Sequence, residues 1–312
     1  MAEIQSELKR LGLAEDIERV IARKILPRLP ETQRVSFIEQ ELKWVIDAKP
    51  SAESLEVLAD RILTTIPLKQ RMGLFGDVSI VLRHEPSVKA IETIAHALRK
   101  LSPKERSWQF RHDLFKTLRH RLTDDHWDFA SAVISSLPKG AHKNLLGETL
   151  PKILEHAPAT QVLRTVAEEI MPHVPKKNLL TFLSETLPAM LSSKPSAERV
   201  CGQWMAVRKK LLPLLSKKDM EYFYSADLPA VMKYNPSPEV LAVFGEKFIS
   251  QMPRGSRNGL FHFANHLLEE RPTPEELAYL GDHFTAKTSP KQRWFTIGWL
   301  GKEVLLRKRR QG

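Results

Sequence analysis

The sequence predicts an all-α protein, a right-handed α-solenoid of about seven to eight two-helix repeats of 35–40 residues. Three observations carry this prediction. Prolines recur at nearly constant steps, hydroxyl residues follow many of them, and apolar residues return at helical spacing. Two-helix units bury their apolar faces by stacking on one another, which favours an extended array over two compact domains.

A repeat of 35–40 residues is visible in the prolines. A leading proline recurs through the chain, and a second proline follows 19 to 23 residues later in six units, with Leu122 in its place in the third. Each unit is therefore predicted to contain helix A, a proline turn, helix B and another proline turn. The leading prolines are Pro30, Pro67, Pro103, Pro138, Pro175, Pro213, Pro253 and Pro290.

Hydroxyl residues mark the expected start of helix B. They stand directly after the second proline, at Ser51, Ser87, Ser196, Ser237 and Thr273. Such a hydroxyl accepts a hydrogen bond from the free N–H groups of a first helical turn. Thr273 and Glu276 also have the spacing of a capping box.

Helix B carries one apolar face in every unit. Positions five, nine and twelve after the second proline lie on that face. Position nine is small in most units, which predicts close approach of a neighbouring helix; Trp204 is the exception. The small residues are Ala59, Ala95, Ala167, Gly245 and Gly281.

The repeat divides the chain into three parts within one continuous domain. Residues 1–29 form an N-terminal helical cap, residues 30–289 form seven two-helix repeats, and residues 290–312 form a C-terminal capping helix with a basic tail. No linker is expected between them.

Basic residues gather at one place in the repeat. The formal charge is +11, of which residues 138–312 carry +9, and Lys or Arg follows each leading proline in the first turn of helix A. The helix dipole disfavours cations there by up to ~1 kcal/mol each. We interpret these residues as a rim of phosphate contacts, and the alternative is a solvated rim. The candidates are Lys69, Arg71, Lys104, Arg106, Lys139, Lys143, Lys176, Lys177, Lys217, Lys218, Arg254, Arg257, Lys291 and Arg293.

Aromatic residues near this rim are candidates for stacking on nucleic-acid bases. Trp108, Tyr222 and Trp294 lie in first turns beside basic residues, where we expect exposure. Phe110 falls on the repeated core position and is expected to be buried.

Signals for catalysis and for cofactors are weak. His262 and His266 are four residues apart, but Phe263 stands where a metalloprotease motif has glutamate. The polar cluster around His120 and Asp124 is irregularly spaced and fits a capping loop. The chain has one cysteine, Cys201, and no Gly-rich phosphate loop. We therefore expect a protein that is not an enzyme and that has no metal or cofactor.

The sequence predicts a cytoplasmic protein without a membrane segment. Charged residues run through the first thirty positions, and no apolar run approaches the ~20 residues that span a bilayer.

The two-helix period resembles that of the octotricopeptide and heptatricopeptide repeat class, whose members bind RNA. HEAT-like solenoids are similar almost to the same extent. The resemblance covers nearly the whole chain and rests on period and apolar pattern, so it assigns no binding residue.

The sequence leaves three functions open. The first is a nucleic-acid-binding solenoid, with RNA preferred over DNA. The second is a protein–protein interaction scaffold for an acidic partner, since solenoids offer long surfaces to other proteins. The third is an enzyme of the helical-repeat DNA glycosylase type.

Overall fold

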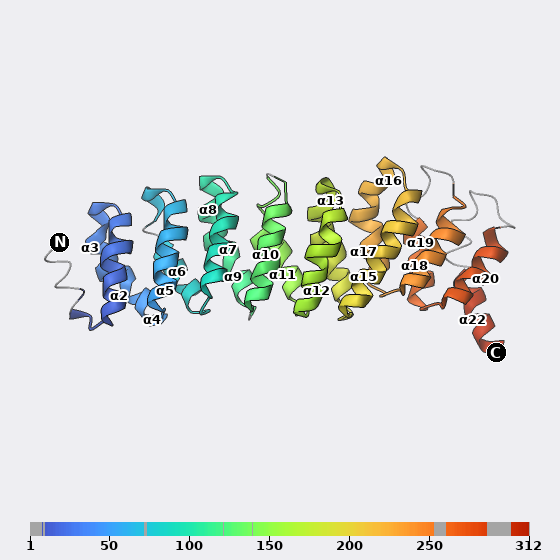
Figure 1. Cartoon of the computed structure of the whole chain (residues 1–312), viewed down its shortest axis with the longest axis horizontal. Helices are drawn as coiled ribbons and strands as arrows, with labels where there is room; N and C mark the ends of the chain where they lie inside the picture. The colour runs from blue at the N-terminus through green and yellow to red at the C-terminus, as the bar shows by residue number, and fades with distance from the viewer. Residues whose placement is uncertain are drawn as a thin grey trace. The chain divides into compact units, whose positions relative to one another are not determined.

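Helices account for every regular element that the structure describes (Figure 1). It is a computed structural model, and it describes residues 8, 10–71, 74–120, 122–138, 140–252, 260–285 and 301–311. The chain packs as two units, Met1–Glu155 and His156–Gly312, and each is described by itself.

The first unit contains α-helices joined by short 3-10 and π turns, which are labelled η. Many of these elements abut, so that α8, η9 and α9 form one continuous helix. The elements are α2 (Glu15–Val20), η1 (Ile21–Ile25), η2 (Leu26–Arg28), η3 (Glu31–Gln33), α3 (Arg34–Ser36), η4 (Phe37–Glu41), α4 (Leu42–Asp47), α5 (Ala52–Val57), η5 (Leu58–Ile62), η6 (Leu63–Thr65), η7 (Leu68–Gln70), α6 (Phe75–Leu82), α7 (Val88–Arg99), α8 (Pro103–Trp108), η9 (Gln109–Asp113), α9 (Leu114–Leu118), α10 (Asp124–Ser136), η10 (Leu145–Thr149) and α11 (Leu150–Leu154).

The second unit is built in the same way. Its elements are α12 (Thr160–Thr165), η11 (Val166–Ile170), η12 (Met171–His173), α13 (Lys176–Thr181), η13 (Phe182–Thr186), α14 (Leu187–Leu191), α15 (Ala197–Ala206), η14 (Val207–Leu211), η15 (Leu212–Leu214), α16 (Lys217–Tyr222), η16 (Phe223–Asp227), α17 (Leu228–Met232), α18 (Pro238–Phe244), η17 (Gly245–Ile249), α19 (Leu260–Glu269), α20 (Pro274–Thr285) and α22 (Gly301–Gln311).

Within each unit, helices of the same type pack on one another. In the first unit α6 contacts α4 and α9, while α7 contacts α5 and α10. In the second unit α14 contacts α17, and α15 contacts α12 and α18. The A helices and the B helices therefore form separate layers in each unit, and the buried apolar side chains lie between them.

The turn from helix A to helix B has one conformation in six places. A non-glycine residue with φ between +45° and +51° precedes a proline, and helix B starts after it. The serines at 51, 87, 196 and 237 accept a hydrogen bond from the third helical N–H, and Thr273 forms the expected capping box with Glu276. These helix starts are confirmed. The left-handed residues are Lys49, Glu85, Ala157, Lys194, Asn235 and Arg271.

Widened π turns accommodate prolines near or within the helices. A proline has no N–H to donate, and its ring collides with the carbonyl four residues earlier in an α-helix. In six places a five-residue π turn ends two residues before a proline, which shifts the hydrogen-bond register at that point. The prolines are Pro27, Pro151, Pro172, Pro188, Pro213 and Pro229.

Pro213 has a different role from the one that its spacing predicts. The spacing makes it the leading proline of its repeat, equivalent to Pro175. The structure instead places it in η15 at the end of a B helix, as Pro172 is placed in η12, and Ser216 is the N-cap of the following helix. Proline spacing cannot distinguish a proline that ends a B helix from one that precedes an A helix, because the two positions lie within four residues of each other.

Two B helices approach their neighbours closely, as the small residues at position nine predict. A Cβ atom on Gly245 would lie 2.9 Å from the carbonyl oxygen of Lys210, and one on Gly281 would lie 2.5 Å from the Cβ of Lys247. Trp204 is buried at the same position, with its ring edge against Phe182. Helix separation therefore varies along the B layer of the second unit.

Replacing Gly245 by alanine tests this close approach. We expect Gly245→Ala to lower the free energy of unfolding by about 1–3 kcal/mol, since backbone must shift to admit the methyl group. Gly76→Ala is the matched control, because the nearest atom, on Trp44, would lie at 3.4 Å. Urea unfolding followed by circular dichroism measures both, and equal effects at the two positions would contradict the proposed contact.

Candidate nucleic-acid interface

The lysines of the predicted rim are exposed wherever the structure describes them. Lys69, Lys104 and Lys143 are exposed in the first unit. In the second unit Lys176, Lys177, Lys217 and Lys218 are exposed, and we name these four the lysine edge. Figure 1 shows α13 and α16, which begin with these residues, starting at the same end of that unit.

Two packed A helices hold the lysine edge together. η13 packs on η16 and α14 on α17, so the first turns of α13 and α16 are neighbours. Lys177 Nζ lies 2.6 Å from Glu221 Oε1 across them, and this contact keeps the pKa of Glu221 below its usual value. The other three lysines have no carboxylate at ion-pair distance among the described residues.

A local capping box explains how α16 tolerates two lysines at its start. Ser216 Oγ accepts from the N–H of Asp219, and Asp219 Oδ2 accepts from the N–H of Ser216 at 3.1 Å. The buried Asp219 carboxylate complements the positive end of the helix dipole. The lysines are therefore not needed for capping and point their charge to solvent.

Three further cations lie at this end of the second unit. Arg208, Lys209 and Lys210 are exposed in η14, where a B helix ends shortly before α16 begins. They have no ion pair with the described carboxylates. The helix dipole favours cations at a helix C-terminus, so the sequence alone gives no reason to assign these three residues to a binding site. The structure gives one, because it places them next to the lysine edge.

Arg71 and Arg106 differ from the lysines, because their guanidinium groups are occupied within the protein. Arg106 donates from Nε to the carbonyls of Leu98 and Leu101, both at 3.0 Å, and from Nη1 to Thr65 at 2.7 Å. These carbonyls lie at the ends of two successive B helices. Arg106 therefore bonds carbonyl groups at the ends of both B helices, including that of Leu98, which also accepts from the N–H of Leu101.

Arg71 makes the same contacts one repeat earlier. It donates from Nε to the carbonyl of Ile66 at 2.9 Å and from Nη1 to that of Arg28 at 2.6 Å. Burial, and then the nearby Arg28, hold the pKa of Arg71 below its usual value. The negative ends of neighbouring B helices thus explain these cations, and we leave Arg71 and Arg106 out of the interface.

His142 continues this series in the next repeat. Its side chain is buried, and Nε2 lies 2.9 Å from the carbonyl oxygen of Ile134 at the end of α10. A carbonyl can only accept, so Nε2 carries the proton. The contact with helix ends is therefore a structural role that three different repeats share.

The predicted stacking residues are exposed where the structure describes them. Trp108 is 60% exposed and Tyr222 44% exposed, and the Trp108 ring lies 4.1 Å from that of His112 between centroids. Phe110 is buried, as expected. The remaining candidates lie outside the described residues: Lys139, Arg254, Arg257, Lys291, Arg293 and Trp294.

The polar cluster around His120 ties helices together. Thr123 and His126 form a capping box at the start of α10. Asp124 Oδ1 accepts from Ser87 Oγ at 2.7 Å, and Asp128 pairs with Lys89 at 2.6 Å. Within the described part of the chain, no three His, Cys, Asp or Glu residues are placed to hold a metal ion, and no helix is long and apolar enough to cross a membrane.

Comparison with protein-family models, with curated proteins and with solved structures found no match for this chain.

Removing the Arg106 side chain tests its structural role. We expect Arg106→Ala to lower the free energy of unfolding by about 2 kcal/mol, because the variant loses the charged hydrogen bonds to the carbonyls of Thr65, Leu98 and Leu101. Lys104→Ala, at an exposed site in the same turn, should change it by less than about 0.5 kcal/mol. Denaturant titration compares the two variants, and an Arg106 effect no larger than that of Lys104 would rule out the role.

Proposed function

We propose that this chain is a non-catalytic nucleic-acid-binding protein, with RNA preferred, built as a right-handed α-solenoid. The observation that carries the proposal is the gathering of exposed cations at one end of the second unit. The lysine edge and the run Arg208 to Lys210 place seven cations there, and among described residues only Lys177 is paired with a carboxylate.

The repeated geometry within each unit supports the solenoid. A helices pack on A helices, B helices pack on B helices, and the same left-handed turn recurs between them. Arg71 and Arg106 bridge successive helix ends at a spacing of one repeat. In this proposal the repeats stack like those of the octotricopeptide class, whose period the chain shares.

The charge distribution supports a polyanionic partner. Residues 156–312 carry 23 Lys and Arg against 15 Asp and Glu, whereas residues 1–155 carry 25 against 22. Lysines that neutralise phosphates release condensed counterions, which gives sequence-independent affinity that falls with salt. The second unit is therefore the proposed binding unit.

Exposed aromatic rings favour a single strand. Tyr222 lies in α16, little more than one turn after Lys217 and Lys218, so its ring is available to a base whose phosphates contact these lysines. Stacking on aromatic rings is the usual way in which unpaired bases are held, and RNA more often presents such bases.

A protein scaffold is the second candidate, and a different surface favours it. Trp44, Ile80 and Phe115 are each exposed by more than 40% on the neighbouring helices α4, α6 and α9 of the first unit. Large exposed apolar side chains on adjacent helices are typical of protein interfaces. An acidic partner would use the basic edges as well.

Charge reversal on the lysine edge tests the proposed function. We expect Lys217→Glu with Lys218→Glu to weaken binding of a labelled 20-nucleotide single-stranded RNA at least tenfold at 100 mM NaCl. The slope of log affinity against log salt should fall by about 1.4, or 0.7 per lost phosphate contact. Fluorescence anisotropy between 50 and 200 mM NaCl measures both quantities, with single-stranded DNA of the same sequence expected to bind more weakly.

The matched control carries the same change in charge elsewhere in the second unit. Arg164→Glu with Lys194→Glu alters two exposed cations at the other end of the helices and should leave RNA affinity within twofold. Equal losses in the two double variants, or no RNA binding by the native protein at 50 mM NaCl, would refute the proposal and favour the scaffold.

A further inference from the structure

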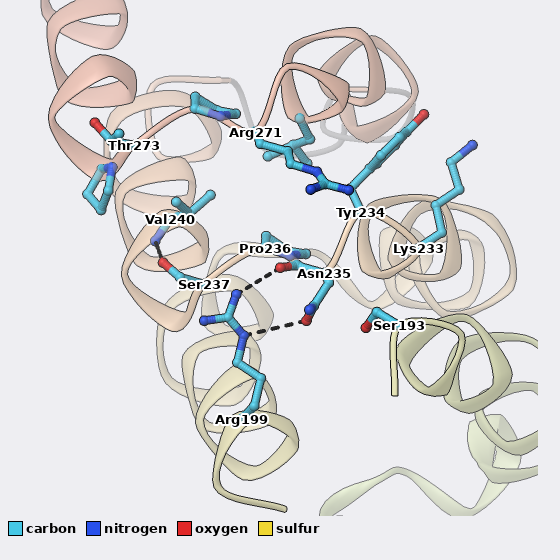
Figure 2. A pocket seen from close by; sticks show the side chains of 13 residues that line it. Ser193, Arg199, Lys233, Tyr234, Asn235, Pro236, Ser237, Val240, Arg271 and Thr273 are labelled. Carbon is cyan, nitrogen blue, oxygen red and sulfur yellow. Dashed lines mark hydrogen bonds between the residues drawn. The ribbon is translucent and has the colours of Figure 1, made fainter. Parts of the chain in front are cut away.

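A cavity of about 590 Å³ opens at the A-to-B turns of the second unit (Figure 2). It lies between two consecutive left-handed turns, at residues 233–237 and 271–274. Its lining includes the cations Arg199, Lys233 and Arg271 and the ring of Tyr234, and no Asp or Glu lines it. Its volume is in the range of cavities that hold small ligands.

A hydrogen-bond network builds one wall of the cavity. Arg199 Nη2 donates to the carbonyl of Asn235 at 2.8 Å, and Arg199 Nε donates to Asn235 Oδ1 at 3.4 Å. The buried Gln203 donates from Nε2 to the same Oδ1 at 2.8 Å and to the carbonyl of Pro236 at 2.9 Å. Figure 2 shows the two bonds of Arg199.

These bonds determine the orientation of the Asn235 side chain. Because Oδ1 accepts from two donors, the amide nitrogen must be the other atom of the group, and it has no partner among the described residues. Asn235 therefore contributes two N–H donors that nothing described on the protein uses.

None of the three cations of the cavity forms an ion pair with a described carboxylate. Glu239 lies within electrostatic reach of Arg199: hydrogen bonds from its own N–H and from Ser237 lower its pKa most, and the charge of Arg199 lowers it further. Arg199 is bonded to the neutral Asn235, Lys233 Nζ lies 4.7 Å from the centroid of the Tyr234 ring, and Arg271 has no ion pair. The nearby Glu276 is held elsewhere, by Arg309 and by the N–H of Thr273. Three cationic side chains and the N–H donors of Asn235 therefore line one cavity, and no carboxylate is among its lining residues.

The repeat by itself does not produce this composition. The corresponding cavity between two turns of the first unit, of about 760 Å³, is lined by Arg83 and Arg119 but also by Glu85. Of these two cavities, only that of the second unit has no carboxylate among its lining residues.

We propose that the cavity at Arg199, Lys233, Asn235 and Arg271 binds a small phosphate-bearing ligand with at least two negative charges. The guanidinium group of Arg271 can offer paired donors to phosphate oxygens, Arg199 offers the N–H groups that Asn235 does not use, and Lys233 supplies a compact charge. The Tyr234 ring offers an apolar face to an attached group. The site is separate from the proposed nucleic-acid interface. The continuous helix of α16, η16 and α17 has 16 residues and a length of about 24 Å, with Lys217 at its first residue and the cavity beyond its last.

Calorimetric titration of the whole 312-residue chain with inorganic pyrophosphate tests the site. We expect saturable binding, and at least tenfold weaker binding when Lys233→Gln and Arg271→Gln are combined. Asn235→Asp is the sharper variant, because it keeps the acceptor for Arg199 and Gln203 but replaces the free N–H donors by a negative oxygen. It should lose binding by a similar factor without loss of helical circular dichroism.

The controls separate this site from the lysine edge. Lys217→Gln with Lys218→Gln should bind pyrophosphate as the native protein does. A parallel titration with AMP identifies the class of ligand. AMP that binds at least as tightly as pyrophosphate indicates a nucleotide, and weaker binding of AMP indicates a free inorganic anion. Either result supports the site. No saturable binding of either probe, an equal loss in the lysine-edge variant, or an unchanged affinity in Asn235→Asp would overturn it. The proposal would also be overturned if the combined Lys233→Gln and Arg271→Gln variant lost as much RNA affinity as the lysine-edge variant, because the two sites would then not be separate.

Discussion

Unpaired backbone groups at helix ends are the constraint on which the rest of this structure depends. A helix leaves its first N–H and last C=O groups without partners, and a chain made of short helices must satisfy these groups many times. The protein does so with a small set of devices. Serine and threonine hydroxyls cap the starts of B helices, while Arg71, Arg106 and His142 bond carbonyls at or just beyond their ends.

The same constraint separates two kinds of cation that look alike in the sequence. Arg71, directly after η7, and Arg106, in the first turn of α8, stand where they do because the negative ends of B helices lie beside them. Lys217 and Lys218 stand in an equivalent turn, where Asp219 already caps the helix. The positive charges of Lys217 and Lys218 are not needed to stabilise the helix. We therefore assign these charges to the binding of a ligand.

Surplus positive charge occurs at both ends of the A helices in the second unit, with different surroundings. At the lysine edge it is open and flanked by Tyr222, which suits a flexible polyanion. At the A-to-B turns it lines a cavity whose wall is held by Asn235 and Gln203, which suits a small ligand of defined shape. The left-handed conformation of Asn235 serves both the turn and the cavity, since it directs the chain into Pro236 while the side chain bonds Arg199.

The sequence by itself determined the helical class, the caps at Ser51, Ser87, Ser196, Ser237 and Thr273, and the exposure of Trp108 and Tyr222. These features follow from hydrogen bonding and apolar spacing within a few residues, which a sequence displays directly. Only the tertiary structure decided that Pro213 ends a B helix, that arginines and lysines of one rim have different roles, and that Arg199, Lys233 and Arg271 line the cavity at Asn235. The roles of Arg71, Arg106 and Arg199 depend on which helix end or turn lies beside each side chain, and that bonding partner stands 36 to 43 residues away in the sequence.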